Sequence, residues 1–445
     1  GGDRERRRCH EARRPGHDVR VVLSASACAP DRGSEPGTGW QWATAAASRH
    51  EVWLLTPERN RDAIESERSG RPDLAGLTPV YVPEPSWIPT DASALRFRRA
   101  RYLFWQREVG VMARELHRTA RFDVAHHVTF ASDWQPCGLA RLDDLPLVWG
   151  PVGGATRSAW PLWRELGPRG LAEEAVREVV TGTARRAIGR RVARRAAVTV
   201  AMNPDVAAAF GSVADVVVEP NVAIDPAVLD HPSPPTGPTD RYCTAVFAGR
   251  LIGWKGARLA IEALARPEAA DWRLELLGEG PREGDLRRLA DGLGLADRVE
   301  FRGYRPRDEV LDTLARADAF VFPSLHDSAG WAVAEAITLG CPVVCLDRGG
   351  PALLAGEVGD QVVPVTASVV ADLATALDRV RPRGDRSPRW TADRLPDVID
   401  DLYRRAVAHH DRGRVGKGAS AAAAPAGPIG GAGPSARPTT TEPMP

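Results

Sequence analysis

Two acidic side chains stand eight residues apart in the stretch PSLHDSAGWAVAEAITLGCPVVC, which covers residues 323–345. Asp327 comes just before a predicted helix that Ser328 is suited to cap, and apolar residues repeat on one face of that helix. Glu335 therefore falls on the opposite face, two turns into the helix. Carboxylates placed this way can bind hydroxyl groups, Asp327 those of a sugar beside a phosphate and Glu335 a ribose diol. A capping aspartate and a solvated glutamate are the alternative interpretation of the two acids alone.

The same region offers groups that can hold a phosphate. Gly330 and Trp331 are expected in the first turn of the helix, where backbone N–H groups lack partners within the helix and are open to phosphate oxygens. The loop FAGRLIGWKG, which follows an apolar run, adds Gly249, Arg250 and Lys255. A planar Arg fork and a Lys point charge together suit a diphosphate. Taken alone, this loop is equally consistent with a surface turn that carries ordinary basic residues.

A further glycine turn, LLGEGPREG, contains Gly278 and also follows an apolar run. It is not a dinucleotide-binding fingerprint, because Glu283 interrupts the pattern and no helix-packing glycine follows at the required spacing. Two interpretations stay open for this turn. It is either a tight turn beside a nucleotide or a tight turn without a ligand.

The elements that must position these residues follow from the hydrophobic pattern. Short β-branched runs alternate with helical stretches from Val19 onward, and strands separated by helices pair as parallel sheets with helices on both faces. We therefore predict an α/β protein with two Rossmann-like domains whose parallel sheets face a cleft between them. The runs in the first half are VRVVLSA, HEVWLLT, TPVYVP, FDVAHH, LPLVWG, AVTVAM and DVVVEP, and those in the second half are CTAVFAG, RLELLGEG, DRVEFRG, AFVFPS, PVVCLD and QVVPV.

Length and composition set the expected domain boundaries. A chain of 445 residues exceeds what one hydrophobic core usually fills. The segment DPAVLDHPSPPTGPTDR carries five prolines, which neither join a sheet nor continue a helix, so it is predicted to link two domains. The predicted order is a charged, unstructured N-terminus (1–18), a first Rossmann-like domain (19–225), the linker (226–241), a second Rossmann-like domain (242–385), a helical segment that packs back toward the first domain (386–412) and a disordered Ala/Gly/Pro-rich tail (413–445).

The net charge of +1 gives no reason to expect nucleic acid as a partner. Two stretches are nevertheless strongly basic: residues 96–121 contain eight Arg and two Glu, and residues 184–195 contain six Arg and no acid. Such clusters can hold a protein near anionic lipid, and a solvated Arg-rich face is the alternative. The six scattered cysteines are typical of reduced thiols, and neither a signal peptide nor an apolar run of ~20 residues is visible. We expect a cytoplasmic protein whose membrane contact, at the inner face, is at most peripheral.

Four motifs together resemble a known family. The motifs GRLIGWKG, LELLGEGP, VEFRGY and PSLHDSAGWAVAEAITLGCPVV are similar to consecutive motifs of the retaining glycosyltransferases of family 4, also called glycosyl transferases group 1, which have the two-Rossmann fold named GT-B. The resemblance implies that a nucleoside-diphosphate sugar lies between the domains, mainly on the second one. It matches Arg250 and Lys255 with the pair that binds the diphosphate, Glu335 with the acid that binds ribose and Asp327 with the acid that touches the donor sugar. That last position is commonly Glu, which is one methylene longer.

The resemblance also covers the first domain, which it places on the acceptor side. The stretch SEPGTGWQWA resembles the family's glycine loop over the donor phosphates, with Gly37 and Gly39 giving close backbone approach. The family has a histidine that faces the donor sugar near the stretch FDVAHHVTF, and we favour His127 over His126 for this role. One packed and one exposed histidine is the alternative. The turn WGPVGG is expected to line the acceptor side.

The function that this resemblance implies is transfer of a sugar from a UDP- or GDP-sugar to the hydroxyl of a sugar, lipid-linked or small-molecule acceptor, as in polysaccharide or glycoconjugate synthesis. Retention at the anomeric carbon is expected, with no cofactor and no metal, because the chain has no Asp-x-Asp pair to clamp a metal–diphosphate and its cations can stabilise the leaving diphosphate instead. An epimerase or phosphorylase of the same fold and a non-catalytic nucleotide-sugar-binding module remain as alternatives. A Rossmann oxidoreductase is disfavoured, because no Gly-x-Gly-x-x-Gly follows the first strand.

Overall fold

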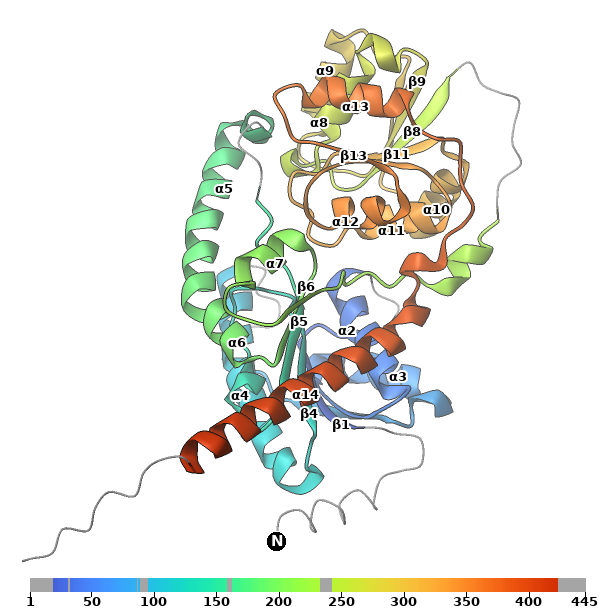
Figure 1. Cartoon of the computed structure of the whole chain (residues 1–445). Coiled ribbons are helices and arrows are strands. Elements are labelled where there is room, and N and C mark those ends of the chain that lie inside the picture. Colours follow the sequence, from blue (N-terminus) through green and yellow to red (C-terminus); the bar gives the residue numbers. More distant parts are fainter. Residues whose placement is uncertain are drawn as a thin grey trace, which may run out of the picture.

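The computed structural model describes residues 19–30, 33–85, 87–88, 95–157, 162–232 and 242–422. These residues form two α/β domains, one above the other in Figure 1. The charged N-terminus predicted for residues 1–18 lies outside the described residues, as do most of the proline-rich linker and the last part of the tail.

The first domain is built on seven parallel strands in the order β3-β2-β1-β4-β5-β6-β7, so that the order reverses between β1 and β4. Their β-branched and apolar side chains are buried under helices on both faces of the sheet. The strands are β1 (Arg20–Ala25), β2 (Glu51–Pro57), β3 (Leu77–Val82), β4 (Val124–Thr129), β5 (Leu147–Val152), β6 (Val198–Ala201) and β7 (Val216–Val218).

The second domain has six parallel strands in the order β10-β9-β8-β11-β12-β13, with the reversal between β8 and β11. Each of the thirteen runs predicted to form a strand overlaps one, so the prediction of two parallel sheets is confirmed. The strands are β8 (Cys243–Ala248), β9 (Trp272–Leu277), β10 (Val299–Gly303), β11 (Ala319–Phe322), β12 (Val343–Leu346) and β13 (Gln361–Val363).

Helices connect the strands of both sheets. In the first domain they are α2 (Ser34–Ala47), α3 (Arg61–Arg68), α4 (Leu95–Ala120), α5 (Trp163–Ala184), α6 (Arg190–Arg195) and α7 (Pro204–Phe210), and in the second α8 (Ala257–Leu264), α9 (Glu283–Gly292), α10 (Arg307–Arg316), α11 (Trp331–Thr338), α12 (Gly349–Val358) and α13 (Val369–Asp378). Short 3₁₀ turns are η1 (Glu58–Asn60), η2 (Pro72–Leu74), η3 (Gly138–Arg141), η6 (Pro226–Asp230), η7 (Gly253–Lys255), η8 (Pro267–Ala269), η9 (Pro388–Trp390) and η10 (Ala392–Arg394), and η5 (Arg185–Gly189) is a π-helix.

The last helix, α14 (Leu395–Ala422), returns from the second domain and runs across the first (Figure 1). Its apolar face, which includes Ile399, Leu402 and Tyr403, is buried in the core of the first domain together with α2. The helix continues past residue 412, where the sequence analysis placed the start of a disordered tail, so that boundary was wrong. The physical reason is that a helix already nucleated and docked gains one hydrogen bond for each residue added.

Candidate active site

The loops that follow the strands of the two domains meet each other. Asn203, after β6, donates from Nδ2 to the backbone oxygen of Ser328, after β11, at 3.0 Å. The backbone N–H of Gly349, after β12, donates to Oδ2 of Asp205 at 3.2 Å. Ligands of open parallel sheets bind beyond the carboxyl ends of the strands, where the strand order reverses. The region where these loops meet is therefore the candidate active site.

Lys255 and Asp327 form an ion pair at this place, although 72 residues separate them in the chain. η7, which ends with Lys255, follows β8, and Asp327 follows β11, and these two strands are neighbours across the reversal point of the second sheet. The Lys255 ammonium lies 4.7 Å and 4.8 Å from the ring centroids of Trp254 and Phe322. Both side chains of the pair are only 16% exposed. Two of the predicted site residues thus lie together, as expected from the rule that places ligands beyond the carboxyl ends of parallel strands.

The second carboxylate oxygen of Asp327 accepts hydrogen bonds from the backbone N–H groups of Ala329 and Gly330, each at 3.1 Å. Burial opposes the charge of Asp327, but Lys255 and these two N–H groups together hold its pKa below the usual value. Helix α11 begins at Trp331 with Gly330 as its N-cap residue, at φ 79°, so the assignment of Ser328 as the cap was wrong. The Gly330 N–H, expected to be open to phosphate, is bound by Asp327 because a carboxylate three residues earlier is a strong acceptor within reach.

Gly249 and Gly278 follow β8 and β9 and lie against each other. A Cβ added to Gly278 would stand 2.0 Å from the backbone oxygen of Gly249, and both residues have positive φ. These contacts explain both glycines without a ligand, so their contact with a nucleotide stays a prediction. Arg250 is exposed on the same loop, five residues before Lys255.

Glu335 is paired with an arginine that the sequence analysis missed. Its Oε1 accepts from Nε of Arg307, the first residue of α10, at 2.9 Å. The Glu335 side chain is 13% exposed, and burial raises its pKa even though the Arg307 charge opposes that shift. The only sequence signal for Arg307 was its position shortly after an apolar run. Trp331, expected to contribute to the nucleotide site, packs its ring against the cores of both domains.

The glycines predicted to form a loop over the donor phosphates lie inside a helix instead. Gly37 and Gly39 belong to the first turns of α2, which begins at Ser34. Pro36 is tolerated in the first turn because its missing N–H needs no partner there. A Cβ on Gly39 would lie 2.0 Å from the backbone oxygen of Ala27, after β1. The close backbone approach is therefore made to the protein's own chain, and the loop prediction was wrong.

Both histidines of β4 are buried, because neighbouring strand residues face opposite sides of a sheet that is covered on both sides. The exposed histidine of the alternative interpretation is therefore excluded. His126 lies toward α14, and its two ring nitrogens contact the Tyr403 hydroxyl at 2.8 Å and the Gly150 carbonyl oxygen at 2.9 Å. Nε2 of His127 lies 3.4 Å from the hydroxyl of Tyr102 on the α4 side. Burial lowers the pKa of His127 to about 4.

A small cavity that Tyr102 lines opens at the carboxyl ends of the first sheet. Its volume is about 160 Å³. One of its arginines, Arg59, pairs with Glu84 and donates to the backbone oxygen of Ser26 at 2.8 Å. The sequence analysis missed this cavity because α4 was interpreted only as a basic stretch. The lining residues are Ser26, Pro57, Arg59, Glu84, Arg101, Tyr102, Trp105 and Phe130.

The turn WGPVGG packs between the domains. A Cβ on Gly153 would stand 3.2 Å from the Cβ of Ser328, in the loop that carries Asp327. Gly154, at φ +121°, lies against the carboxylate of Asp133. The turn is therefore close to the pair of Lys255 and Asp327, and its predicted contact with an acceptor stays a prediction.

Comparison with known proteins identifies the second of these domains. Residues 234–381 match the family model described as glycosyl transferases group 1. The match extends over the second domain, from before β8 to the end of α13. The matched segment contains both members of the pair formed by Lys255 and Asp327, as well as Glu335 and Arg307.

Proteins with this type of domain align with the chain over part of their length. Over 177 residues the chain is 30% identical to a 2-deoxystreptamine glucosyltransferase from Streptomyces kanamyceticus, a segment that covers 37% of this chain and 44% of that protein. Over 131 residues it is 36% identical to the lipopolysaccharide core biosynthesis glycosyltransferase LpsE from Rhizobium meliloti, covering 29% and 35% of the two proteins. The matched part of the chain thus spans less than half the length of each of these two relatives.

The solved structures extend the likeness to both domains. A sucrose-phosphate synthase from Thermosynechococcus elongatus is similar with a TM-score of 0.56 at 16% identity, over 88% of this chain and 100% of that one. At this level of identity the likeness concerns the fold alone. The two-domain GT-B architecture expected from the sequence is confirmed.

Proposed function

We propose that the protein is a glycosyltransferase that moves a sugar from a UDP- or GDP-sugar to an acceptor hydroxyl during the synthesis of a polysaccharide or glycoconjugate. The observation that carries this proposal is the ion pair of Lys255 and Asp327, with both side chains 16% exposed, at the reversal point of the second sheet. It lies in the glycosyl transferases group 1 domain and beside the loops of the first domain. A single ammonium and a single carboxylate at such a point suit a diphosphate and the sugar attached to it.

In this proposal the donor replaces contacts that the protein makes with itself. The Lys255 ammonium exchanges its carboxylate partner for a diphosphate oxygen, and exposed Arg250 on the same loop adds a second cation. Asp327 then accepts from the donor sugar hydroxyls, and Glu335 from the ribose. The cations stabilise the charge that develops on the leaving diphosphate, without a metal or a cofactor.

We further propose transfer with retention, on the strength of the family resemblance. The acceptor oxygen forms its bond to the anomeric carbon on the face from which the diphosphate departs. The carbon–oxygen bond to the diphosphate breaks, and the acceptor proton moves to a phosphate oxygen. No protein carboxylate has to be the nucleophile, so the shorter Asp327 suffices. The anomeric configuration of the product, read by proton NMR, tests retention, and activity in EDTA tests independence from metal.

We place the acceptor at the cavity of the first domain that Tyr102, Trp105 and Phe130 line, with His127 behind Tyr102. Aromatic rings together with Arg101 and the pair of Arg59 and Glu84 offer a sugar-sized ligand both stacking surfaces and hydrogen bonds.

Calorimetry with UDP and GDP, followed by assays of donor hydrolysis, tests the central proposal. Binding of one nucleotide and slow hydrolysis of its sugar conjugates are the expected results. Turnover without any acceptor beyond hydrolysis, or a requirement for phosphate, would favour an epimerase or phosphorylase. Nucleotide binding with no hydrolysis and no transfer to any acceptor would favour a binding module.

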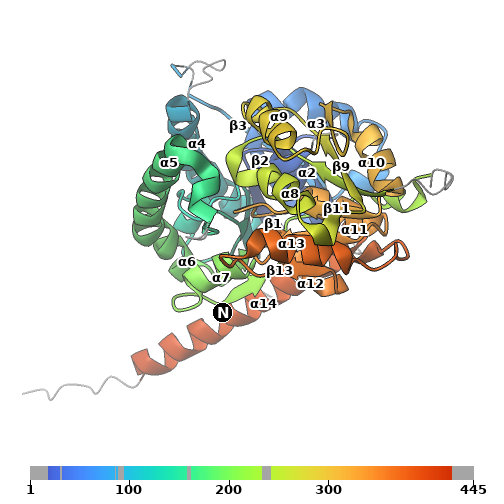
Figure 2. The ribbon, with the colours of Figure 1, turned by 90° about the horizontal axis from the view of Figure 1, so that it is seen from above.

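Peripheral contact with an anionic membrane is a separate proposal, supported by the placement of the two Arg clusters. α4, α5 and α6 gather on one side of the molecule (Figure 2), and α4, η3, η5 and α6 line a groove of about 770 Å³. Arg114, Arg141, Arg191 and Arg195 line it together with one acid, Asp143. In the described part of the chain, no helix has the length and apolarity to cross a bilayer.

Sedimentation with phosphatidylglycerol vesicles tests this contact. Binding at low salt that is lost at high salt, and lost in Arg141→Glu/Arg191→Glu but kept in Arg266→Glu, is expected from charge attraction. Arg266 is an exposed arginine of the second domain. Equal sedimentation with neutral phosphatidylcholine vesicles would contradict the proposal.

A further inference from the structure

Helix α5 belongs to the first domain by sequence, but its beginning packs against the second. Leu162 and Leu166 are 1% and 7% exposed and are part of the apolar core of the second domain, and Leu171 packs against that core. Gly167, at φ 69°, interrupts the helical geometry between them. Figure 1 shows α5 rising from the first domain alongside the second. One continuous element therefore contacts both halves of the candidate active site.

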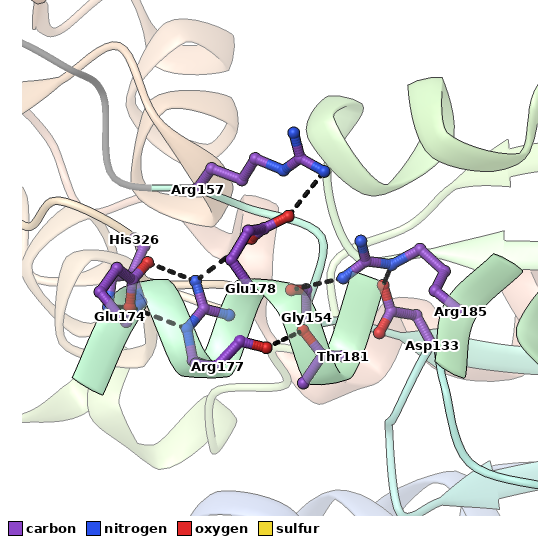
Figure 3. A network of polar contacts seen from close by, with 9 residues as sticks. All are labelled: Asp133, Gly154, Arg157, Glu174, Arg177, Glu178, Thr181, Arg185 and His326. Carbon is purple, nitrogen blue, oxygen red and sulfur yellow. Dashed lines mark hydrogen bonds and ion pairs between the residues drawn. The ribbon is translucent and has the colours of Figure 1, made fainter. Parts of the chain in front are cut away.

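Midway along this helix, Glu174 reaches the loop that carries Asp327. Its Oε2 lies 3.8 Å from Nε2 of His326, the residue just before Asp327 (Figure 3). The His326 ring stacks on Trp254, with centroids 4.6 Å apart and planes at 22°. Trp254 is followed in the chain by Lys255, whose ammonium lies 4.7 Å from the centroid of the same indole ring. A chain of contacts thus runs from α5 to the pair of Lys255 and Asp327.

The carboxylate of Glu174 is held in place by its own helix. Nε of Arg177 donates to Oε2 of Glu174 at 2.8 Å, so the oxygen that faces His326 is oriented by a second charged group. At the end of α5, Arg185 pairs with Asp133 and donates to the backbone oxygen of Gly154 at 3.1 Å (Figure 3). The end of the helix therefore contacts the turn WGPVGG of the first domain, and its middle contacts the loop that carries Asp327.

The effect of Glu174 on the His326 imidazole depends on the charges around that ring. Burial lowers the pKa of His326, the Glu174 carboxylate opposes that shift and the Arg177 guanidinium adds to it. Without the Glu174 charge, the imidazole loses the carboxylate that lies 3.8 Å from its Nε2, while the guanidinium of Arg177 stays nearby. The side chains of Glu174 and His326 are 13% and 14% exposed, so water screens this change only in part.

We propose that Glu174 is a positioning residue for the pair of Lys255 and Asp327. It contacts neither of them and acts through His326 and Trp254, whose stacked rings set where the Lys255 ammonium lies. Through these contacts, the first domain controls how Lys255 binds the donor diphosphate. The part that concerns the donor rests on the proposed function, whereas the control of Lys255 does not.

The chain allows a direct test because Lys255 and Lys417 are its only two lysines. Brief acetylation of the full-length protein with acetic anhydride, read by mass spectrometry, gives the rate at Lys255 relative to Lys417. We expect Glu174→Gln to raise this ratio about 3-fold or more, because the ammonium leaves its carboxylate partner more often. Glu173→Gln is the matched control, since Glu173 is the exposed neighbour on the same helix.

A double-mutant cycle separates positioning from a general loss of stability. His326→Ala should raise the ratio as Glu174→Gln does, and the double variant should exceed neither single variant, because both changes break one chain of contacts. Equal ratios for Glu174→Gln and Glu173→Gln, or additive effects in the cycle, would overturn the proposal. Failure of UDP and GDP to slow acetylation of Lys255 in the unmodified protein would instead count against the proposed function.

Discussion

His126 and Tyr403 are 277 residues apart in sequence, yet Nδ1 of the histidine lies 2.8 Å from the tyrosine hydroxyl. The carbonyl of Gly150 accepts a hydrogen bond from Nε2, so Nδ1 accepts from the hydroxyl and the imidazole is neutral. Burial lowers the pKa of His126 to about 3, in agreement with this state. The contact fastens the last helix, α14, to a central strand of the first domain.

Tyr403→Phe should reduce the free energy of unfolding by about 1–3 kcal/mol, because it leaves the buried Nδ1 of His126 without its donor. Urea denaturation monitored by circular dichroism measures this change. Tyr304→Phe is the control, since Tyr304 is 70% exposed and should tolerate the loss of its hydroxyl. Equal stability of the two variants would show that the contact between His126 and Tyr403 contributes nothing.

Lys255→Ala should weaken UDP or GDP binding by roughly 1.5–3 kcal/mol, the usual value of a charge-assisted contact. Calorimetry measures the affinity, and inorganic pyrophosphate should lose affinity in parallel because the contact is to the diphosphate. The variant also leaves the buried Asp327 without its partner, so its melting temperature is expected to fall. Arg258→Ala, which removes an exposed cation of α8, is the control. Unchanged affinity would end the assignment of Lys255 to the diphosphate.

Glu335→Gln should weaken UDP binding roughly 5- to 10-fold and leave pyrophosphate binding unchanged, because this side chain is assigned to the ribose. Burial raises the pKa of Glu335, which means that its ionised form is disfavoured in the folded protein. Removing that charge is therefore expected to keep or raise the melting temperature at neutral pH. A large fall in melting temperature would indicate that the pair with Arg307 is mainly structural.

Asp360→Asn should stabilise the protein at pH 7.5 and have no effect at pH 3.5. Burial raises the pKa of Asp360 to about 6, so the folded state keeps the proton more tightly than the unfolded state. The stability of the unmodified protein accordingly falls as the pH rises from about 4 to about 6, and the variant lacks this loss. Because the residue is partly exposed, the expected gain is about 1 kcal/mol. Asp62→Asn on α3 is the control for urea denaturation at both pH values.

The pattern of the sequence predicted the elements well because most of the parallel strands are buried on both faces and read as apolar runs. The same rule, which places ligands beyond the carboxyl ends of strands, predicted that Lys255 and Asp327 belong to one site. The family resemblance predicted a loop at Gly37 and Gly39 where the structure has a helix, since a glycine that lets α2 approach Ala27 has the same local signature as one that lies beside a ligand.

The partners of the site residues could not be predicted from the pattern. Arg307 and Glu335 come from different helices, and His326 meets Glu174 on a helix of the other domain. Local periodicity says which face of a helix is apolar, but it does not say which distant element covers that face. The order of neighbouring histidines in β4 likewise left open which one would lie under α14.

The sequence alone determined the strand positions and the two sheets, because these depend on hydrophobic periodicity. It also determined that one cation and one acid lie beyond the carboxyl ends of the second sheet, because that depends on the direction of parallel strands. The tertiary structure decided that Lys255 and Asp327 neutralise each other, that Gly330 is already bound and that α5 reaches from one domain to the other. Gly330 is bound by a carboxylate three residues earlier, whereas the pair of Lys255 and Asp327, 72 residues apart, and the reach of α5 depend on distances between remote segments of the chain. The sheet of the second domain sets the first of these distances, and the contact of α5 with the core of the second domain sets the other.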